Sequence, residues 1–261
     1  MNVTLNYKEI HHSANLFKAK SLTNSKKTCL VTGAGTGIGL AITKKLLSES
    51  YHVIAHYNSS NDHLKELQSE FSQLTSIQED FSSPQAGEKL FSKIEKPIDI
   101  LINNAGILPT AKEFINTDYS DVIKTFEINF FSAMQLCQKV IPHMKTQNWG
   151  RIVNISSIGV KFAGNQYTMA YNLSKSCLEQ LTESLNKSYA VDNVLTNTIR
   201  VGVTDTDLHK RSQHKNMDKR VKMIPLKRMG KPEEVADLVT YLISDKANFI
   251  SGQTIAVAGG E

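Results

Sequence analysis

Tyr171 and Lys175 are the residues whose types and spacing most directly indicate chemistry. They stand four residues apart in segment 170–175, which reads as helix. Four residues make about one helical turn, so both side chains are expected on one face. An ammonium group beside a phenol favours the phenolate and is expected to lower the pKa of Tyr171 from about 10. The pair is a candidate proton donor and acceptor near neutral pH, although the same spacing alone also fits an ordinary helix face.

A glycine-rich turn separates an expected strand from an expected helix near the start of the chain. Residues 28–32 are a short apolar run, and a helix pattern extends from the glycines to Leu47. Glycines let the backbone turn tightly and approach a pyrophosphate, which would lie at the helix N-terminus. The spacing is G-x-x-x-G-x-G rather than G-x-G-x-x-G. The position of the turn therefore predicts dinucleotide binding rather than a plain tight turn. Its candidate cofactor contacts are Gly33, Thr36, Gly37, Ile38 and Gly39.

The loop after the second expected strand, residues 52–56, bears on which dinucleotide is bound. An acid at this point holds the ribose 2′-hydroxyl of NAD and would repel a 2′-phosphate. No acid occurs between His56 and Asp62, whereas Asn58 and Ser59 can donate hydrogen bonds to a phosphate. The sequence thus favours NADP(H) over NAD(H). No arginine is nearby, so a polar loop that accepts either cofactor stays an alternative.

The third expected strand, residues 75–79, runs into Asp80 and Phe81. A carboxylate there can accept a hydrogen bond from an adenine amino group. The alternative is a cap for the helix that follows. Both residues are candidate cofactor contacts.

Two later strands also end in polar residues. Residues 98–102 lead into a second candidate cofactor loop, and residues 151–157 end in Ser156 and Ser157. Ligands bind at the carboxyl ends of parallel strands, so these side chains are candidate site residues. The candidate contacts of the first loop are Asn104, Ala105 and Gly106.

The expected strands alternate with helices along the chain. Helices are expected at 118–145, 168–190 and 232–244, and the last strands at 193–200 and 254–257. Such alternation with short connections predicts a single-domain α/β fold, a doubly wound parallel sheet of about seven strands with helices on both faces.

Asn129 is unusual within the expected helix 118–145. Asparagine inside a helix costs about 0.7 kcal/mol relative to alanine, and here large apolar residues flank it. We expect it to be partly buried and held by hydrogen bonds; a solvent-facing side chain is the alternative.

Composition excludes several classes of protein. The chain has 261 residues and a net charge of +5, of which the first 27 residues carry +4, so nucleic-acid binding is not indicated. Cys29, Cys137 and Cys177 lack metal-binding spacing and are expected to be buried thiols in a reducing compartment, the cytoplasm. No apolar run is long enough to span a membrane. Residues 1–26 are expected to form a basic arm that packs on the surface or frays, with a transit peptide as the alternative.

Taken together, these motifs resemble the short-chain dehydrogenase/reductase family over residues 27–261, the expected Rossmann-fold domain. The shared motifs are Thr32-Gly33-x-x-x-Gly37-Ile38-Gly39, Asp80, Asn103-Asn104-Ala105-Gly106, Asn129, Ser157, Tyr171-x-x-x-Lys175 and Ser251-Gly252-Gln253. The resemblance implies a carbonyl–alcohol oxidoreductase in which the nicotinamide transfers a hydride and no metal is needed.

The resemblance also implies a role for each matching residue. Tyr171 is the general acid in reduction, and Lys175 lowers its pKa and binds the nicotinamide ribose. Ser157 bonds the substrate oxygen, and Asn129 holds a water in a proton relay. Contacts after the sixth strand are Gly202, Thr204 and Thr206.

Three departures from the family pattern stand out. Val201 occurs where the family usually has proline, and Ala258 where it commonly has aspartate. Ser157 lies one residue further from Tyr171 than expected, so Ser156 is a rival for its role.

The substrate is less clear from the sequence than the reaction. The chain resembles 3-oxoacyl-carrier-protein reductases, and segment 203–230, which covers the substrate in this family, is rich in Lys and Arg. A cationic segment would attract an acidic carrier protein or CoA, or it is simply a solvated helix. The alternatives are a sugar, polyol or other secondary-alcohol dehydrogenase and, remotely, a non-catalytic dinucleotide-binding protein. The resemblance further implies a homotetramer packed through helices 118–145 and 168–190.

Overall fold

A seven-stranded parallel sheet forms the centre of the computed structural model, which describes residues 27–59, 61–110, 112–206 and 217–261. The strand order is β3-β2-β1-β4-β5-β6-β7, and each pair is parallel. The predicted fold is confirmed. The strands are β1 (Thr28–Val31), β2 (His52–Tyr57), β3 (Leu74–Gln78), β4 (Ile100–Asn103), β5 (Gly150–Ser157), β6 (Val194–Val201) and β7 (Thr254–Val257).

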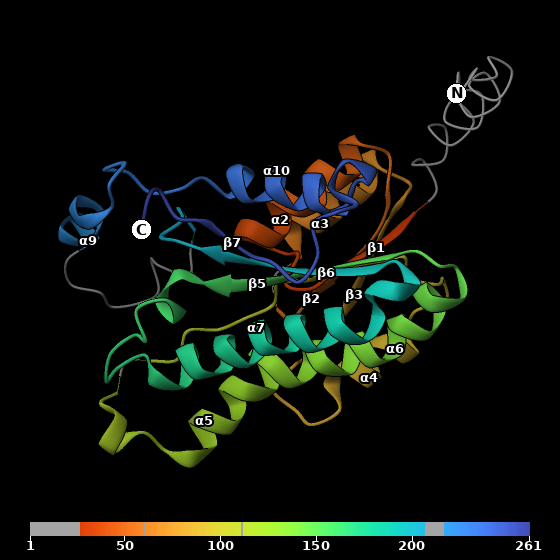
Figure 1. Ribbon diagram of the computed structural model, residues 1–261. Coiled ribbons are helices and arrows are strands. Elements are labelled where there is room, and N and C mark those ends of the chain that lie inside the picture. Colours follow the sequence, from red (N-terminus) through yellow and green to blue (C-terminus); the bar gives the residue numbers. More distant parts are fainter. Residues whose placement is uncertain (1–26, 60, 111, 207–216) are drawn as a thin grey trace, which may run out of the picture.

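Helices cover both faces of the sheet (Figure 1). One face carries α2 (Gly37–Ser48), α3 (Asp62–Glu70) and α10 (Pro232–Ile243), and the other carries α4 (Ala86–Ser92), α5 (Tyr119–Phe126), α6 (Ser132–Thr146) and α7 (Met169–Tyr189). A short helix, α9 (Met217–Met223), lies beyond the carboxyl ends of the strands. A buried apolar cluster fills the space under each helix layer, which is why the central strands are apolar on both sides.

The direction in which successive strands are added to the sheet reverses between β3 and β4. The chain moves outward from β1 through β2 to β3 and then returns to place β4 beside β1. The loops that follow β1 and β4 therefore diverge to opposite faces and leave a crevice at their carboxyl ends. The glycine-rich turn and the Asn104–Gly106 loop border this crevice.

The helix expected at 118–145 has an irregular centre. α5 continues into one π-helical turn (Glu127–Phe131), and α6 follows without a break. Single π turns inside α-helices are frequent at functional sites. This one contains Asn129, which is buried, as the sequence predicts.

Some predictions fall outside the described residues. Residues 1–26, the predicted arm, are among these, so the division at residue 27 stays a prediction. Segment 203–230 is described except for 207–216. Among the described helices none is long and apolar enough to cross a membrane. The three cysteines are free, but Cys177 on α7 is partly exposed and not buried as predicted.

Candidate active site

A cavity of about 490 Å³ opens at the carboxyl ends of β1, β4, β5 and β6; we call it the cleft. It brings together segments that lie far apart in the sequence, including the glycine-rich turn and the Tyr171–Lys175 pair. The predicted site residues that line it are Gly33, Thr36, Gly37, Ile38, Gly39, Asn58, Ser59, Asn104, Ala105, Gly106, Ser157, Tyr171, Lys175, Gly202, Thr204 and Thr206. Three predicted residues are not among its lining: Asp80, Phe81 and Asn129.

The glycine-rich turn is shaped by two close approaches. Gly33 has φ +65°, and a Cβ there would lie 2.9 Å from the Cα of Ala105. A Cβ on Gly39 would lie only 2.1 Å from the carbonyl oxygen of Gly33. Side chains at either position would push the turn away from β4 or from α2. The turn therefore holds backbone N–H groups at a helix N-terminus, where a pyrophosphate binds.

The glycine-rich turn and the loop after β4 are bonded to each other. The Thr32 hydroxyl accepts hydrogen bonds from the backbone N–H of Asn104 and of Ala105, both at 3.0 Å. The Asn104 side-chain amide donates to the carbonyls of Thr32 (2.8 Å) and Gly33 (3.2 Å). These bonds fix the two walls of the crevice relative to each other.

His56 supports the same turn from β2, and its role was missed in the sequence. Its Nδ1 accepts a hydrogen bond from the Gly33 backbone N–H at 3.2 Å, and its Nε2 lies 3.0 Å from the Glu79 carbonyl oxygen. This pairing requires the neutral ring protonated on Nε2. Burial lowers the pKa of His56 to about 4, which keeps the ring neutral. The signal was present: a polar residue at the end of a buried apolar strand needs partners.

The structure places the predicted adenine contacts outside the cleft lining. The exposed Asp80 carboxylate accepts hydrogen bonds from the backbone N–H and the hydroxyl of Ser82, both at 2.8 Å. It caps its own turn, six residues before α4 begins. Phe81 is buried and stacks on the His56 ring with centroids 4.0 Å apart. Phe81 thus packs against His56, and direct cofactor contact by Asp80 or Phe81 stays a prediction.

The Asn129 side chain is fixed by hydrogen bonds to two neighbouring segments. Its Oδ1 accepts from the Ile107 backbone N–H at 2.8 Å, and its Nδ2 donates to the Ile107 carbonyl (3.1 Å) and to the Ser174 hydroxyl (3.0 Å). It therefore joins the π turn to the loop after β4 and to α7. A Cβ on Gly106 would lie 3.3 Å from Asn129 Oδ1 and 3.1 Å from Lys175 Nζ, so both side chains pack against that glycine.

Lys175 is almost completely buried, and no carboxylate of the described residues forms an ion pair with it. Nζ donates a 2.8 Å hydrogen bond to the Ile155 carbonyl, and burial lowers the Lys175 pKa to about 8. Burial also raises the pKa of Tyr171, while a hydrogen bond with Ser157 lowers it to a smaller extent. The expected net lowering of the Tyr171 pKa is therefore wrong, because desolvation of the phenolate dominates.

Ser156 and Ser157 face different surroundings. The Ser156 hydroxyl is buried and donates a 2.7 Å hydrogen bond to Glu179 of α7. The Ser157 oxygen accepts from the Gly159 backbone N–H at 3.1 Å and hydrogen-bonds Tyr171. The geometry thus favours Ser157 as the hydroxyl that reaches a substrate oxygen.

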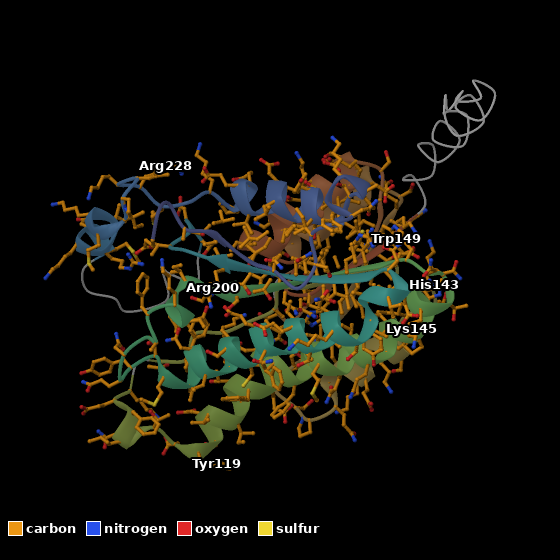
Figure 2. All side chains as sticks on the ribbon, in the orientation of Figure 1. Tyr119, His143, Lys145, Trp149, Arg200 and Arg228 are labelled. Atoms are coloured by element: carbon orange, nitrogen blue, oxygen red, sulfur yellow. The ribbon has the colours of Figure 1, made fainter. Side chains whose placement is uncertain are left out.

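Behind Ser156 lies a bidentate ion pair. Arg200 Nε and Nη2 donate to the two carboxylate oxygens of Glu179 at 2.9 and 2.6 Å. Figure 2 shows Arg200 toward the same end of the molecule as Arg228, away from Trp149 and His143. The pair ties β6 to α7 at the level of the site and so supports Ser156 and its neighbour.

A Tyr–Lys–Ser cluster beside a dinucleotide-binding turn defines an NAD(P)-dependent oxidoreductase site. The chain belongs to the short-chain dehydrogenase/reductase family: the family described as "Enoyl-(Acyl carrier protein) reductase" matches residues 33–261.

Among characterised relatives, the chain is similar to 3-oxoacyl-[acyl-carrier-protein] reductase FabG of Aquifex aeolicus (strain VF5). The two are 36% identical over 242 residues, covering 90% of this chain and 96% of the relative. The FabG of Rickettsia felis is also 36% identical, over 235 residues that cover 90% of this chain and 96% of the relative.

Two solved structures show the same architecture. 4-Hydroxyisoleucine dehydrogenase complexed with NADH superposes with a TM-score of 0.83 and 30% identity, covering 90% of this chain and 98% of that one. A 3-oxoacyl (acyl-carrier-protein) reductase from Agrobacterium tumefaciens C58 with NADP bound also has a TM-score of 0.83 and 30% identity, covering 94% and 99%. The chain is thus an NAD(P)-binding oxidoreductase of the FabG-like branch.

Proposed function

We propose that this protein reduces the ketone of a 3-oxoacyl thioester to a secondary alcohol with NADPH. The observation that carries the proposal is the Tyr171–Lys175–Ser157 cluster in one cleft with the glycine-rich turn. Apolar side chains of Leu108 and Ile158 line the same cleft, which suits an acyl substrate. The similarity to FabG reductases supports the thioester.

We assign each residue of the cleft a distinct role in the reaction. The glycine-rich turn and the Asn104–Gly106 loop would hold the cofactor, which would supply a hydride to the carbonyl carbon. Tyr171 donates its proton to the carbonyl oxygen, and Ser157 donates a hydrogen bond to that oxygen. Lys175 returns a proton to Tyr171 and regains one from water, through the relay proposed for Asn129. One hydride and one proton are consumed for each alcohol formed.

Two features support NADPH over NADH. Asn58 and Ser59 line the cleft, and no acidic residue is among the described residues that line it. A 2′-phosphate would therefore meet hydrogen-bond donors and no carboxylate. The similar Agrobacterium tumefaciens reductase has NADP bound, whereas 4-hydroxyisoleucine dehydrogenase has NADH bound.

CoA and an acidic carrier protein are the two candidate carriers of the acyl group, and the basic segment 203–230 gives only limited support for the protein carrier. Arg228 is already bonded to both carboxylate oxygens of Glu234 at 2.9 and 2.6 Å. Arg220 is paired with Glu261. Lys210, Arg211 and Lys215 lie outside the described residues. We therefore propose the small thioester as the recognised group and leave the carrier to experiment.

We also propose a homotetramer in the cytoplasm. Tyr119 and Ile123 of α5 and Leu173 of α7 are exposed, at 79%, 36% and 51%, and an apolar surface on these helices suits a subunit contact. The three free cysteines suit a reducing compartment.

The decisive test follows oxidation of NADPH and of NADH with acetoacetyl-CoA, a panel of small ketones and keto-sugars, and crotonoyl-CoA. Fast, NADPH-dependent reduction of acetoacetyl-CoA is expected. Turnover of a ketone or sugar alone would favour a secondary-alcohol dehydrogenase. Turnover of crotonoyl-CoA alone would favour the enoyl reduction in the family's description.

The Tyr171→Phe variant tests the chemical step itself. It keeps the aromatic ring but lacks the proton, so we expect NADPH binding to persist and turnover to fall by about 10²-fold or more. Turnover close to that of the unmodified protein would show that Tyr171 is not the general acid. The fluorescence of NADPH shows whether the variant still binds the cofactor.

A further inference from the structure

Arg220 of α9 is a charged residue in a cleft that has few. Among the described residues that line the cleft, the charged ones are Lys175 and Arg220. Arg220 Nη2 donates a 2.8 Å hydrogen bond to Glu261 Oε2, and its Nη1 lies 2.5 Å from Oε1. The side chain of Arg220 is 32% exposed and that of Glu261 only 8%. The arginine thus lines the cleft, and the side chain of its partner is nearly buried.

Packing holds Glu261 at this arginine. The Leu226 backbone N–H donates to the Gly259 carbonyl at 3.0 Å. A Cβ on Gly259 would lie 2.8 Å from Ile224, and one on Gly260 would lie 2.9 Å from Pro225. Residues 258–261 are therefore fitted against the segment that follows α9. Glu261 is placed by this contact and not only by its ion pair.

We propose that Glu261 determines substrate specificity by occupying Arg220 and so disfavouring substrates that bring a carboxylate into this cleft. An unoccupied arginine in a cleft would bind a carboxylate bidentately. With Glu261 in place, an incoming carboxylate meets a like charge, or must displace a buried carboxylate and leave it unpaired. The cleft then selects a neutral group such as an ester or thioester over the corresponding acid.

This inference rests on the proposed function and deepens it, because a 3-oxoacyl thioester is neutral where the free 3-oxo acid is charged. Acetoacetate and ethyl acetoacetate offer the same ketone and differ in that charge. Their relative kcat/KM therefore reports the discrimination while the hydride and proton transfers stay the same.

The experiment measures kcat/KM of both compounds with NADPH for the full chain and for Glu261→Gln. We expect the ratio of acetoacetate to ethyl acetoacetate to rise about tenfold or more, mainly through a lower KM for acetoacetate. Glu261→Asp, which keeps the charge, should keep the discrimination. Glu233→Gln, at an exposed position of α10, removes the same charge away from Arg220 and should leave the ratio unchanged.

Adding Arg220→Gln to Glu261→Gln should abolish the gain, because the gain requires an unoccupied guanidinium. An unchanged ratio in Glu261→Gln, or a gain that persists in the double variant, overturns the proposal. If the unmodified protein reduces neither compound, acetoacetate is titrated calorimetrically into the unmodified protein and into Glu261→Gln, each with NADP⁺. Equal binding in the two proteins, or no binding in either, also overturns the proposal. Failure of the proposed function is a separate result, the absence of turnover across the substrate panel.

Discussion

The two serines at the end of β5 are neighbours in the sequence but have different partners: Ser156 bonds to a structural ion pair and Ser157 to Tyr171. Both serines bond to residues of α7, about two helical turns apart. Ser156 is turned toward Glu179 and Ser157 toward Tyr171. The sequence left the choice between them open, because only the direction of each side chain distinguishes them.

Replacing each serine by alanine should separate these roles. Ser157→Ala removes a donor to the reacting oxygen and should lower kcat by about 10²-fold with little change in melting temperature. Ser156→Ala breaks a buried hydrogen bond and should cost about 1 kcal/mol of stability with a smaller effect on kcat. Steady-state kinetics and thermal melts of both variants test this, and the reverse pattern would assign the role to Ser156.

The reaction requires Lys175, but we expect burial of its charge to lower the free energy of unfolding of the protein. The pKa of Lys175 is lowered to about 8 by burial, against about 10.4 in an unfolded chain. Below pH 8 the lysine is charged in both states, so the full cost of burying the charge is present. As the pH rises from 8 to 10.4 the folded state loses the proton first, and the cost is relieved.

Lys175→Met should therefore abolish turnover yet raise the stability of the cofactor-free protein at pH 7, by up to about 3 kcal/mol. The advantage should shrink between pH 8 and 10. Denaturant unfolding across this pH range provides the measurement. A Met variant that is less stable at pH 7, or whose advantage does not change with pH, would contradict the assignment of a costly buried charge.

Among the elements, β2 does more than contribute a strand to the sheet. His56 at its carboxyl end accepts the backbone N–H of Gly33 and stacks on Phe81, so it connects the glycine-rich turn to the loop after β3. The sequence separation of 23 residues between His56 and Gly33 hid this bond, because it forms only when β1 and β2 are paired.

His56→Ala should loosen the glycine-rich turn. The Gly33 N–H would lose its partner, and leaving a buried donor unpaired costs about 1–3 kcal/mol. We expect the Kd for NADPH to rise about tenfold with a smaller change in kcat, as measured by fluorescence titration. His52→Ala, at the other end of β2, is the matched control. An unchanged Kd in His56→Ala would show that the turn does not depend on this ring.

Acid provides a second check on His56. Its pKa in the folded protein is about 4, below the value of about 6.5 in an unfolded chain. Its neutral ring therefore contributes stability above pH 6.5 that is lost as the pH falls toward 4. Between pH 6.5 and 4, the His56→Ala variant should therefore lose less stability than the unmodified protein.

At the scale of the whole molecule, the layer of α5 and α7 remains partly uncovered. Tyr119, Ile123 and Leu173 are exposed apolar side chains on it, and Figure 2 shows Tyr119 at the outer side of α5, away from the sheet. Apolar surface of this kind is expected to pack against another subunit.

Placing a charge on this surface should change the assembly. Tyr119→Glu and Leu173→Glu would each bury a carboxylate in the proposed contact, so light scattering should give a mass below that of four chains. Lys65→Glu on α3, on the opposite face of the sheet, should leave the mass unchanged. A tetramer that persists in both glutamate variants would place the contact elsewhere.

The sequence by itself determined the order of strands and helices, the glycine-rich turn, and the Tyr171–Lys175 pair. These depend on local patterns: apolar runs, glycine spacing and the period of a helix. Lys175 and Tyr171 were predicted together because one helical turn sets their separation.

Only the tertiary structure decided which side chains meet across the sheet and how burial shifts their pKa values. Ser157 was separated from Ser156, His56 was brought to Gly33, and Arg220 was joined to Glu261, 41 residues further along. It also reversed the expected direction for the Tyr171 pKa. Such contacts depend on the pairing of distant strands and on the exclusion of water, and neither is encoded in a local pattern.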